Sequence, residues 1–261
     1  MEFLKQCELF NQAADYYDRY RPSYPLEIIN LLEMKTDLSL NSKILEIGSG
    51  TGKATELLAP NGYDILCVEL GEDLIKACSE KLKNFSNIKF YKSQFEIADI
   101  QENTYDLIFS AQAFHWIPQP IGYIKCAKIL KDSGALALIW NMYIVNSNKP
   151  DNELLALSNE YDGLCDFLNE KQCEDRINSI SADIISSGLF HNPEVFRVYW
   201  EQEYSSEEYI GFLKTGNGYL RQSEQIKKEI NYKTETLIKS NDGKIKRRFL
   251  CVLYLTKKRK L

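Results

Sequence analysis

The stretch ILEIGSGTGKAT, Ile44 to Thr55, places three glycines at alternate positions directly after a short apolar run. Glycine permits unusual backbone dihedrals and lets the main chain come close to a ligand, and a helix that follows such a loop offers free N–H groups. Dinucleotides, phosphates and other nucleoside ligands are all bound by loops of this general kind. The residues around the glycines therefore have to distinguish between these ligands.

Two phosphate-binding patterns fail at this loop. A Rossmann dinucleotide fingerprint, G-x-G-x-x-G, needs a third glycine three residues after the second. That position is Lys53 when the pattern starts at Gly48, and Thr55 when it starts at Gly50. A P-loop needs G-x-x-x-x-G-K-[ST], but Ile47 stands five residues before Gly52 and Ala54 follows the lysine. An NAD-dependent oxidoreductase is therefore disfavoured, and so is a P-loop nucleotide-binding protein.

The pattern that remains is E-x-G-x-G-x-G, formed by Glu46, Gly48, Gly50 and Gly52. Glu69 ends the next apolar run, ILCVEL, 17 residues beyond the last glycine. A carboxylate at the C-terminal end of a strand can accept hydrogen bonds from two vicinal ribose hydroxyls. We expect a nucleoside with an amino-acid tail to bind here. Because Glu46 lies inside a strand, we expect it to receive hydrogen bonds from the loop or to orient a ligand amine through water.

Composition narrows the class of protein. The chain has 261 residues, of which 44% are hydrophobic, which is enough for one large domain or one domain with an embedded subdomain. A net charge of −5 supplies no basic surface for nucleic acid, and no apolar run reaches the length of about 18 residues that a membrane span needs. We therefore expect neither nucleic acid nor a membrane as a partner.

The seven cysteines form no CxxC pair, and their odd number excludes complete internal pairing. The first residues, MEFLKQCELF, lack the features of a signal peptide. We expect a cytoplasmic protein that is a monomer or a homodimer.

From about residue 43, short β-rich runs alternate with helical lengths, which predicts βαβ units and a parallel sheet. The expected strands are KILEI, DILCVEL, IKFYKS, YDLIFSA and GALALIWNM, followed by VFRVYWEQEY and RFLCVLYLTKK. Residues 151–190 contain no strand-like run, and we expect a helical insertion over about 142–175. The last two strands are expected to include one antiparallel edge strand.

The glycine loop together with the spaced acid resembles class I S-adenosylmethionine-dependent methyltransferases. The likeness extends in order from ILEIGSGTG through CVEL and FYKSQFEIADIQENTYDLIFSAQAFHWIP to GALALIW. Within this family, DYYDRYRPSYP and AFHWI are similar to a small-molecule branch that includes trans-aconitate methyltransferase. The resemblance implies an α/β, Rossmann-like, doubly wound and mostly parallel seven-stranded sheet with a helical cap insertion, and S-adenosylmethionine as the cofactor.

Four segments follow from this assignment. They are an N-terminal helical lid (1–35), an S-adenosylmethionine-binding core (36–141), a helical insertion with a core helix (142–190), and C-terminal strands with a helical cap segment (191–261). Two prolines interrupt the helix in the turn Arg21-Pro22-Ser23-Tyr24-Pro25. A lid and a packed hinge are both compatible with that turn.

The resemblance also assigns residues to the cofactor. The glycines at 48, 50 and 52 would contact its methionine and ribose parts, and Glu69 both ribose hydroxyls. Ser110 would face the methionine amine or the sulfonium, and Leu70 would be one wall of an apolar adenine slot. Gln94 stands where many relatives have an aspartate for the adenine amino group, and Phe95 follows it. Tyr17 would close over the ligand, and Arg21 would pair with the cofactor carboxylate or, alternatively, with a substrate carboxylate.

The expected chemistry is methyl transfer to a small organic acceptor, most readily at a carboxylate or hydroxyl oxygen. Such a displacement needs a positioned nucleophile and exclusion of water, so no metal is expected. His115 would act as a base, would hydrogen-bond a carboxylate substrate, or would only stabilise its loop. A non-catalytic S-adenosylmethionine-binding regulatory protein is the alternative. Aromatic residues that would line a pocket or fill a core are Trp140, Tyr199, Trp200, Tyr204, Tyr209, Phe212 and Tyr219.

Overall fold

The computed structural model describes residues 14–146 and 148–259, so Cys7 and the rest of segment 1–13 lie outside the described residues, as do Ser147 and 260–261. The chain forms two compact units. Unit 1 comprises Met1–Pro22, Met142–Glu174 and Tyr199–Leu250, and unit 2 comprises Ser23–Asn141, Asp175–Val198 and Cys251–Leu261. Each unit is therefore built from segments that are distant in the sequence.

The sheet has the order β3-β2-β1-β4-β5-β8-β7, and a short strand, β6, pairs with β5 outside this path. Pairing is parallel between β1 and β2, β1 and β4, β2 and β3, and β4 and β5. The strands are β1 (Lys43–Ile47), β2 (Asp64–Glu69), β3 (Ile88–Lys92), β4 (Tyr105–Ala111), β5 (Leu130–Ile144), β6 (Phe167–Leu168), β7 (Glu194–Ser205) and β8 (Lys244–Lys257). The predicted α/β fold with a mostly parallel sheet is confirmed.

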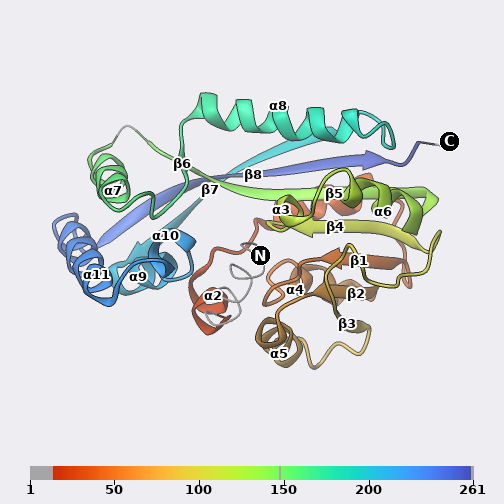
Figure 1. Ribbon diagram of the computed structural model, residues 1–261, viewed down its shortest axis with the longest axis horizontal. Coiled ribbons are helices and arrows are strands. Elements are labelled where there is room, and N and C mark those ends of the chain that lie inside the picture. Colours follow the sequence, from red (N-terminus) through yellow and green to blue (C-terminus); the bar gives the residue numbers. More distant parts are fainter. Residues whose placement is uncertain (1–13, 147, 260–261) are drawn as a thin grey trace. The chain divides into compact units, whose positions relative to one another are not determined.

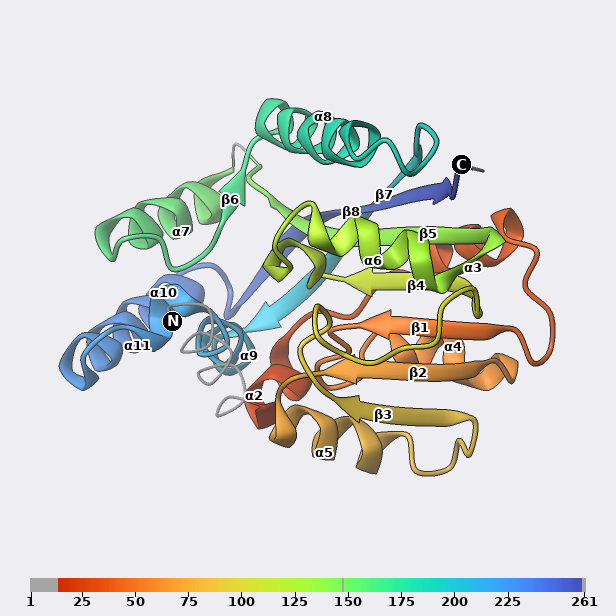
Figure 2. The ribbon, with the colours of Figure 1, turned by 45° about the vertical axis from the view of Figure 1, so that its right-hand side comes forward.

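Two details of the sheet differ from expectation. Figure 2 shows β8 running in the opposite direction to β1 and β4, and its place in the order is between β5 and β7. The antiparallel strand is thus inside the sheet and not at its edge, because β7 occupies the edge and β8 returns between it and β5. In the segment expected to be free of strands, Phe167 pairs with Tyr143, and Leu168 with Ile144. Two residues are too short a run for a sequence pattern to indicate a strand.

Helices cover the sheet of unit 2. Figure 2 shows α3 and α4 behind the sheet and α6 in front of it. In α5 one face is buried, since Leu74 and Cys78 are buried within the helix and Leu82 is buried directly after it. The helical elements that contribute to this unit are α3 (Leu26–Lys35), α4 (Thr55–Leu58), η1 (Ala59–Asn61), α5 (Glu72–Lys81), η2 (Phe114–Trp116), α6 (Ile121–Ile129) and most of α8 (Glu170–Ser186).

Unit 1 is mainly helical, and its elements can be found by their labels in Figure 1. Helix α9 packs against α2 and α11, and α11 also packs against α7. The helices of this unit are α2 (Ala14–Tyr20), α7 (Lys149–Glu160), α9 (Ser206–Leu213), α10 (Asn217–Leu220) and α11 (Glu224–Lys239). Ser205 and Glu208 form a capping box that begins α9. Helix α7 lies within residues 142–175, and the assignment of that segment as a helical insertion stays a prediction.

The aromatic residues of unit 1 largely form a core. Tyr204, Tyr209, Phe212 and Tyr219 are all at least 95% buried, whereas Tyr199 is 48% exposed. None of the helices in the described part of the chain combines the length and the apolar character of a membrane span. The cysteines at 67, 78, 126, 165 and 251 form no disulfide.

Candidate functional site

The glycine loop joins β1 to α4 in unit 2, and its three glycines all have left-handed backbone. The φ angles are +70° at Gly48, +55° at Gly50 and +81° at Gly52. A Cβ at Gly48 would lie 2.4 Å from the Cβ of Ala113, and one at Gly52 would lie 2.5 Å from the Sγ of Cys78. Backbone conformation and packing within the protein therefore already require glycine at two of these positions, before any ligand is considered.

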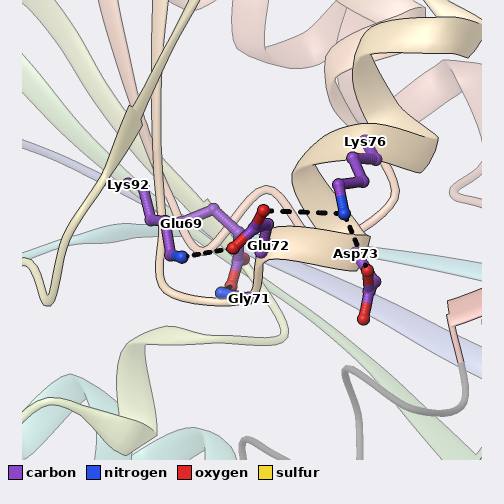
Figure 3. Close-up of polar contacts among 6 residues, drawn as sticks. All are labelled: Glu69, Gly71, Glu72, Asp73, Lys76 and Lys92. Carbon is purple, nitrogen blue, oxygen red and sulfur yellow. Dashed lines mark hydrogen bonds and ion pairs between the residues drawn. The ribbon is translucent and has the colours of Figure 1, made fainter.

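Glu69 binds the backbone around it. One carboxylate oxygen accepts a hydrogen bond from the Gly50 amide at 2.9 Å, and the other accepts from Leu70 at 2.8 Å and Gly71 at 2.9 Å. Burial raises the pKa of Glu69, and these three backbone donors oppose the rise. Figure 3 shows the carboxylate close to Gly71, where α5 begins. Glu69 thus connects the glycine loop to the turn between β2 and α5.

Charged side chains surround this turn on its exposed side (Figure 3). Glu72 forms ion pairs with Lys92 at 2.6 Å and with Lys76 at 3.5 Å, and Lys76 also pairs with Asp73 at 3.4 Å. These side chains are exposed to solvent, so the pairs are screened and add little stability. The two lysines do compensate the negative charges of Glu72 and Asp73. Glu69 is therefore the buried acidic acceptor at the end of β2.

Glu46 in β1 is 1% exposed and lies beneath the loop. Its carboxyl oxygen accepts a hydrogen bond from the Thr55 hydroxyl at 2.5 Å and from the Cys67 thiol at 3.7 Å. Burial raises the pKa of Glu46 to about 8, so the side chain is mostly neutral at pH 7. Of the two expectations for Glu46, hydrogen bonding to the segment after the loop agrees with these contacts, and orientation of a ligand amine stays a prediction.

Several buried polar atoms at the loop have no partner within residues 14–146 and 148–259. They are the hydroxyl oxygens of Ser49 and Thr51 and the Oε1 atom of Gln112. Gln112 follows β4, has a φ of +59°, and donates from Nε2 to the Asn141 carbonyl at 3.1 Å. A buried polar atom normally has a hydrogen-bond partner, so these three atoms fit a polar ligand such as an amino-acid tail or a ribose.

Sequence reasoning missed Gln112, because no sequence pattern indicates a strained backbone or an unpaired amide oxygen at that position. Ser49 and Thr51 occupy the variable positions between the glycines, and their spacing alone gave no reason to select them. The three residues come together because the loop that follows β1 lies next to the loop that follows β4.

The other expected cofactor residues lie at strand ends. Leu70 follows β2, and Gln94 and Phe95 follow β3. Phe95 is 4% exposed, and its ring lies 5.2 Å from the Lys125 ammonium. Ser110 is completely buried in β4 and donates its hydroxyl to the Ile47 carbonyl at 2.9 Å. The Ser110 proton is therefore used within the sheet, and a role toward the cofactor would have to rely on its oxygen as an acceptor.

His115 in η2 is paired with Trp140 in β5. The indole Nε1–H donates to the imidazole Nδ1 at 3.3 Å, and Trp116 lies beside the imidazole with a ring separation of 4.9 Å. Desolvation lowers the pKa of His115 to about 4, with a further contribution from Arg176, although the residue as a whole is exposed to solvent. The indole nitrogen can only donate, so the neutral imidazole carries its proton on Nε2. His115 can therefore donate a hydrogen bond from Nε2 at neutral pH.

Tyr17 and Arg21 belong to unit 1. The Arg21 guanidinium donates to the Tyr143 hydroxyl at 2.8 Å and to the Thr215 carbonyl at 3.2 Å. It also lies 5.4 Å from the Tyr17 ring and 5.2 Å from the Phe212 ring. Assignment of these two residues to the cofactor stays a prediction.

Comparison with known proteins shows what the central part of the chain is similar to. Residues 45–138 match the family described as "Methyltransferase domain". An uncharacterised methyltransferase of Mycobacterium tuberculosis is 30% identical over 132 residues, which cover 51% of each chain. Malonyl-[acyl-carrier protein] O-methyltransferase of Bacillus anthracis is 32% identical over 114 residues, covering 41% of each chain. The chain thus spans about half the length of these curated relatives.

Solved structures show the same fold. A candidate type II methyltransferase from Anaeromyxobacter dehalogenans superposes with a TM-score of 0.66 over 91% of this chain and 98% of that one, at 16% identity. A methyltransferase from Thiobacillus denitrificans, solved with S-adenosylhomocysteine, superposes with a TM-score of 0.53 over 95% and 97% of the two chains, at 13% identity. The expected Rossmann-like architecture is therefore confirmed.

Proposed function

We propose that this chain carries the domain of the class I S-adenosylmethionine-dependent methyltransferases. On that premise, it transfers the methyl group of S-adenosylmethionine to an oxygen of a small organic acceptor. The proposal rests on the hydrogen bond between the glycine loop and Glu69. Beside it lie buried oxygens without a hydrogen-bond partner, which belong to Ser49, Thr51 and Gln112. This is the polar environment that a nucleoside with an amino-acid tail needs.

The cofactor supplies a methyl group on a sulfonium, which is already a good leaving group. The remaining contribution of the protein is to bind the cofactor, orient the acceptor and keep water away. We assign Gly48, Gly50, Gly52 and Glu69 to the ribose and methionine parts. Glu69 has room for a further donor because an ionised carboxylate offers about four acceptor positions, and three are used by backbone amides.

The remaining assignments follow the family resemblance and are proposals of the same kind. They place Leu70, Gln94 and Phe95 around the adenine, Ser110 and Glu46 near the methionine part, and Tyr17 and Arg21 at its carboxylate.

The protonation state of His115 favours a methyl acceptor whose oxygen is already ionised. Its pKa of about 4 and the proton on Nε2 make it a hydrogen-bond donor and a poor base at neutral pH. A carboxylate is nucleophilic at that pH without losing a proton, whereas an alcohol needs a base. We therefore favour a carboxylate over a hydroxyl group, with the acceptor a small molecule of the kind that the trans-aconitate branch uses. The named O-methyltransferase of Bacillus anthracis agrees with an oxygen acceptor.

Calorimetry with S-adenosylhomocysteine tests the cofactor assignment first, with NAD as the comparison ligand. Saturable binding of S-adenosylhomocysteine alone is expected, and binding of NAD alone would overturn the assignment. Incubation with methyl-labelled S-adenosylmethionine and a panel of small carboxylic acids, phenols and amines then tests transfer. Label in a methyl ester is expected. Cofactor binding without transfer to any member would favour the non-catalytic regulatory alternative.

The free thiols at 67, 78, 126, 165 and 251 support a reducing environment, and we propose a cytoplasmic location. Whether the protein is a monomer or a homodimer stays a prediction.

A further inference from the structure

The segment that follows β3 is held in place by a lysine from a different element. We call residues 93–98 the β3 loop; it carries Gln94 and Phe95, the two residues of this loop that are proposed to lie at the adenine. The lysine is Lys125 in α6, which is 27 residues from Ala98 in the sequence. Both segments belong to unit 2, so their contact lies within one compact unit.

The Lys125 ammonium contacts the β3 loop at three points. Its Nζ donates a hydrogen bond to the Glu96 carbonyl at 3.2 Å and another to the Ala98 carbonyl. The same atom lies 5.2 Å from the centre of the Phe95 ring, which is within the range of a cation–π interaction. An ammonium group has three N–H donors and no acceptor, so backbone carbonyls of one loop use two of the three donors.

The β3 loop forms few hydrogen bonds of its own. Its internal backbone bonds share one acceptor, the Gln94 carbonyl, which receives the amides of Ile97 at 3.3 Å and Ala98 at 3.0 Å. Among residues 14–146 and 148–259, Lys125 is the only residue outside β3 and this loop whose side chain donates to the loop. Loss of the amine would therefore leave the carbonyls of Glu96 and Ala98 without this donor.

The surroundings of the lysine show that it can restrict the loop. Phe95 and Ala98 are each 4% exposed, and Lys125 itself is half-buried. Burial lowers the pKa of Lys125, as expected for an amine that has lost part of its hydration. Helix α6 is fixed by its own buried residues, which include Tyr123 and Cys126. The loop is thus bound to a packed helix, and loops without such contacts open more readily than packed elements.

We propose that Lys125 is a positioning residue for the adenine of the cofactor. By binding the carbonyls of the β3 loop from α6, it keeps Gln94 and Phe95 in the conformation that receives the base. The gain is preorganisation, because a loop that is already ordered loses less conformational entropy when a ligand binds. Lys125 acts through the loop and not on the reacting atoms. Its role toward adenine rests on the proposed function, whereas its contact with the loop does not.

Three variants separate positioning from general stability. Lys125→Met keeps a side chain of similar length without any N–H group, and Lys125→Arg keeps the charge and the donors. Lys258→Met is the matched control, because the Lys258 Nζ also donates to a backbone carbonyl, that of Leu130 at 3.2 Å. Leu130 begins β5, and β5 is parallel to β4 and β1. The control bond therefore lies where the parallel strands begin, away from the loops that follow them.

Hydrogen exchange in the full-length chain without ligand tests the contact itself. In Lys125→Met we expect the amides of Ile97 and Ala98 to exchange about tenfold faster or more, because the loop opens more often when two carbonyls lack their donor. Lys125→Arg and Lys258→Met should exchange at these amides as the wild type does. Unchanged exchange in Lys125→Met would overturn the proposal, because the lysine would not restrict the loop.

Calorimetry tests the role toward the base. The two ligands are S-adenosylhomocysteine and its analogue with unsubstituted purine, which lacks the 6-amino group. The wild type is expected to bind the adenine ligand about tenfold more tightly, since one hydrogen bond to the base is missing from the analogue. Lys125→Met should lose most of this preference, and Lys125→Arg and Lys258→Met should keep it. A general loss of stability would weaken both ligands equally and leave their ratio unchanged.

The ratio of the two affinities therefore decides the outcome. A ratio near one in Lys125→Met, with the wild-type ratio in the other two variants, supports the positioning role. The proposal alone is overturned if Lys125→Met keeps the wild-type ratio, or if the wild type binds both ligands equally well. A wild type that binds neither ligand overturns the proposed function as well, so the two failures are distinguishable.

Discussion

The carboxylate of Glu69 and the amide of Gly50, which are 19 residues apart, are joined by a hydrogen bond of 2.9 Å. This bond connects the end of β2 to the centre of the glycine loop. It means that the residue expected to bind ribose also determines the position of the loop. A change at Glu69 therefore acts on ligand binding and on the local backbone together, and an experiment has to separate the two effects.

Glu69→Gln and Glu69→Ala should separate them. Glutamine can keep one oxygen for the amides of Leu70 and Gly71 but presents an NH₂ group to Gly50, whereas alanine leaves all three amides unpaired. We expect alanine to lower the melting temperature more than glutamine, and both to weaken S-adenosylhomocysteine binding by about tenfold or more. Thermal unfolding and calorimetry measure the two quantities. Native affinity in Glu69→Gln would remove the ribose role.

Glu46→Gln should change how stability depends on pH. The pKa of Glu46 is raised to about 8 in the folded protein, from an ordinary value of 4.5, so between these values the unfolded chain loses its proton first. Stability from this group is complete below pH 4.5 and is lost as pH rises toward 8, by at most about 1.4 kcal/mol per pH unit. Glutamine resembles the protonated acid and cannot titrate. Urea unfolding at pH 5, 6, 7 and 8 should therefore show a shallower decline for the variant. Parallel declines would contradict a raised pKa.

Gly48→Ala should destabilise the protein more than Gly188→Ala. Both glycines have a φ of +70°, but an added Cβ meets Ala113 at the first position and nothing within 4 Å at the second. Left-handed backbone costs an alanine about 1–2 kcal/mol at either site, and the steric conflict adds about 1–3 kcal/mol at Gly48. Denaturant unfolding of both variants measures the difference. The added Ala113→Gly change should recover part of the loss in Gly48→Ala, and equal losses in the two single variants would show that packing is not the cause.

Trp140→Phe should raise the pKa of His115. Desolvation and, to a smaller extent, Arg176 lower the pKa of His115. The indole N–H donates to Nδ1 and so also favours the neutral imidazole, and phenylalanine removes that donor. The chain has two histidines, so His191→Gln leaves a single imidazole signal for an NMR titration. In that background we expect a pKa of about 4 for His115 and a value closer to 6.5 after Trp140→Phe. An ordinary pKa before the tryptophan change would restore His115 as a candidate base.

The order and type of the core elements could be predicted from the sequence because buried parallel strands and amphipathic helices follow from local hydrophobic patterns. The runs KILEI, DILCVE and YDLIFSA form strands as expected, and the apolar spacing in α5 marks its buried face. The same local patterns do not determine where the last two strands enter the sheet, since strand order depends on contacts between distant segments. The position of β8 inside the sheet and the pairing of β6 were therefore missed.

For the candidate site, the sequence by itself determined the position of the glycine loop and of the acid at the end of β2, and their spacing predicts the class of ligand that we propose. Those features are local, because a loop between a strand and a helix has few ways to place its amides. Tertiary structure alone decided which donors and acceptors remain unused once the chain has folded. The unpaired oxygens of Ser49, Thr51 and Gln112 depend on loops that meet from distant segments. The hydrogen-bond balance of a buried group depends on all of its neighbours in space, and no linear pattern contains that information.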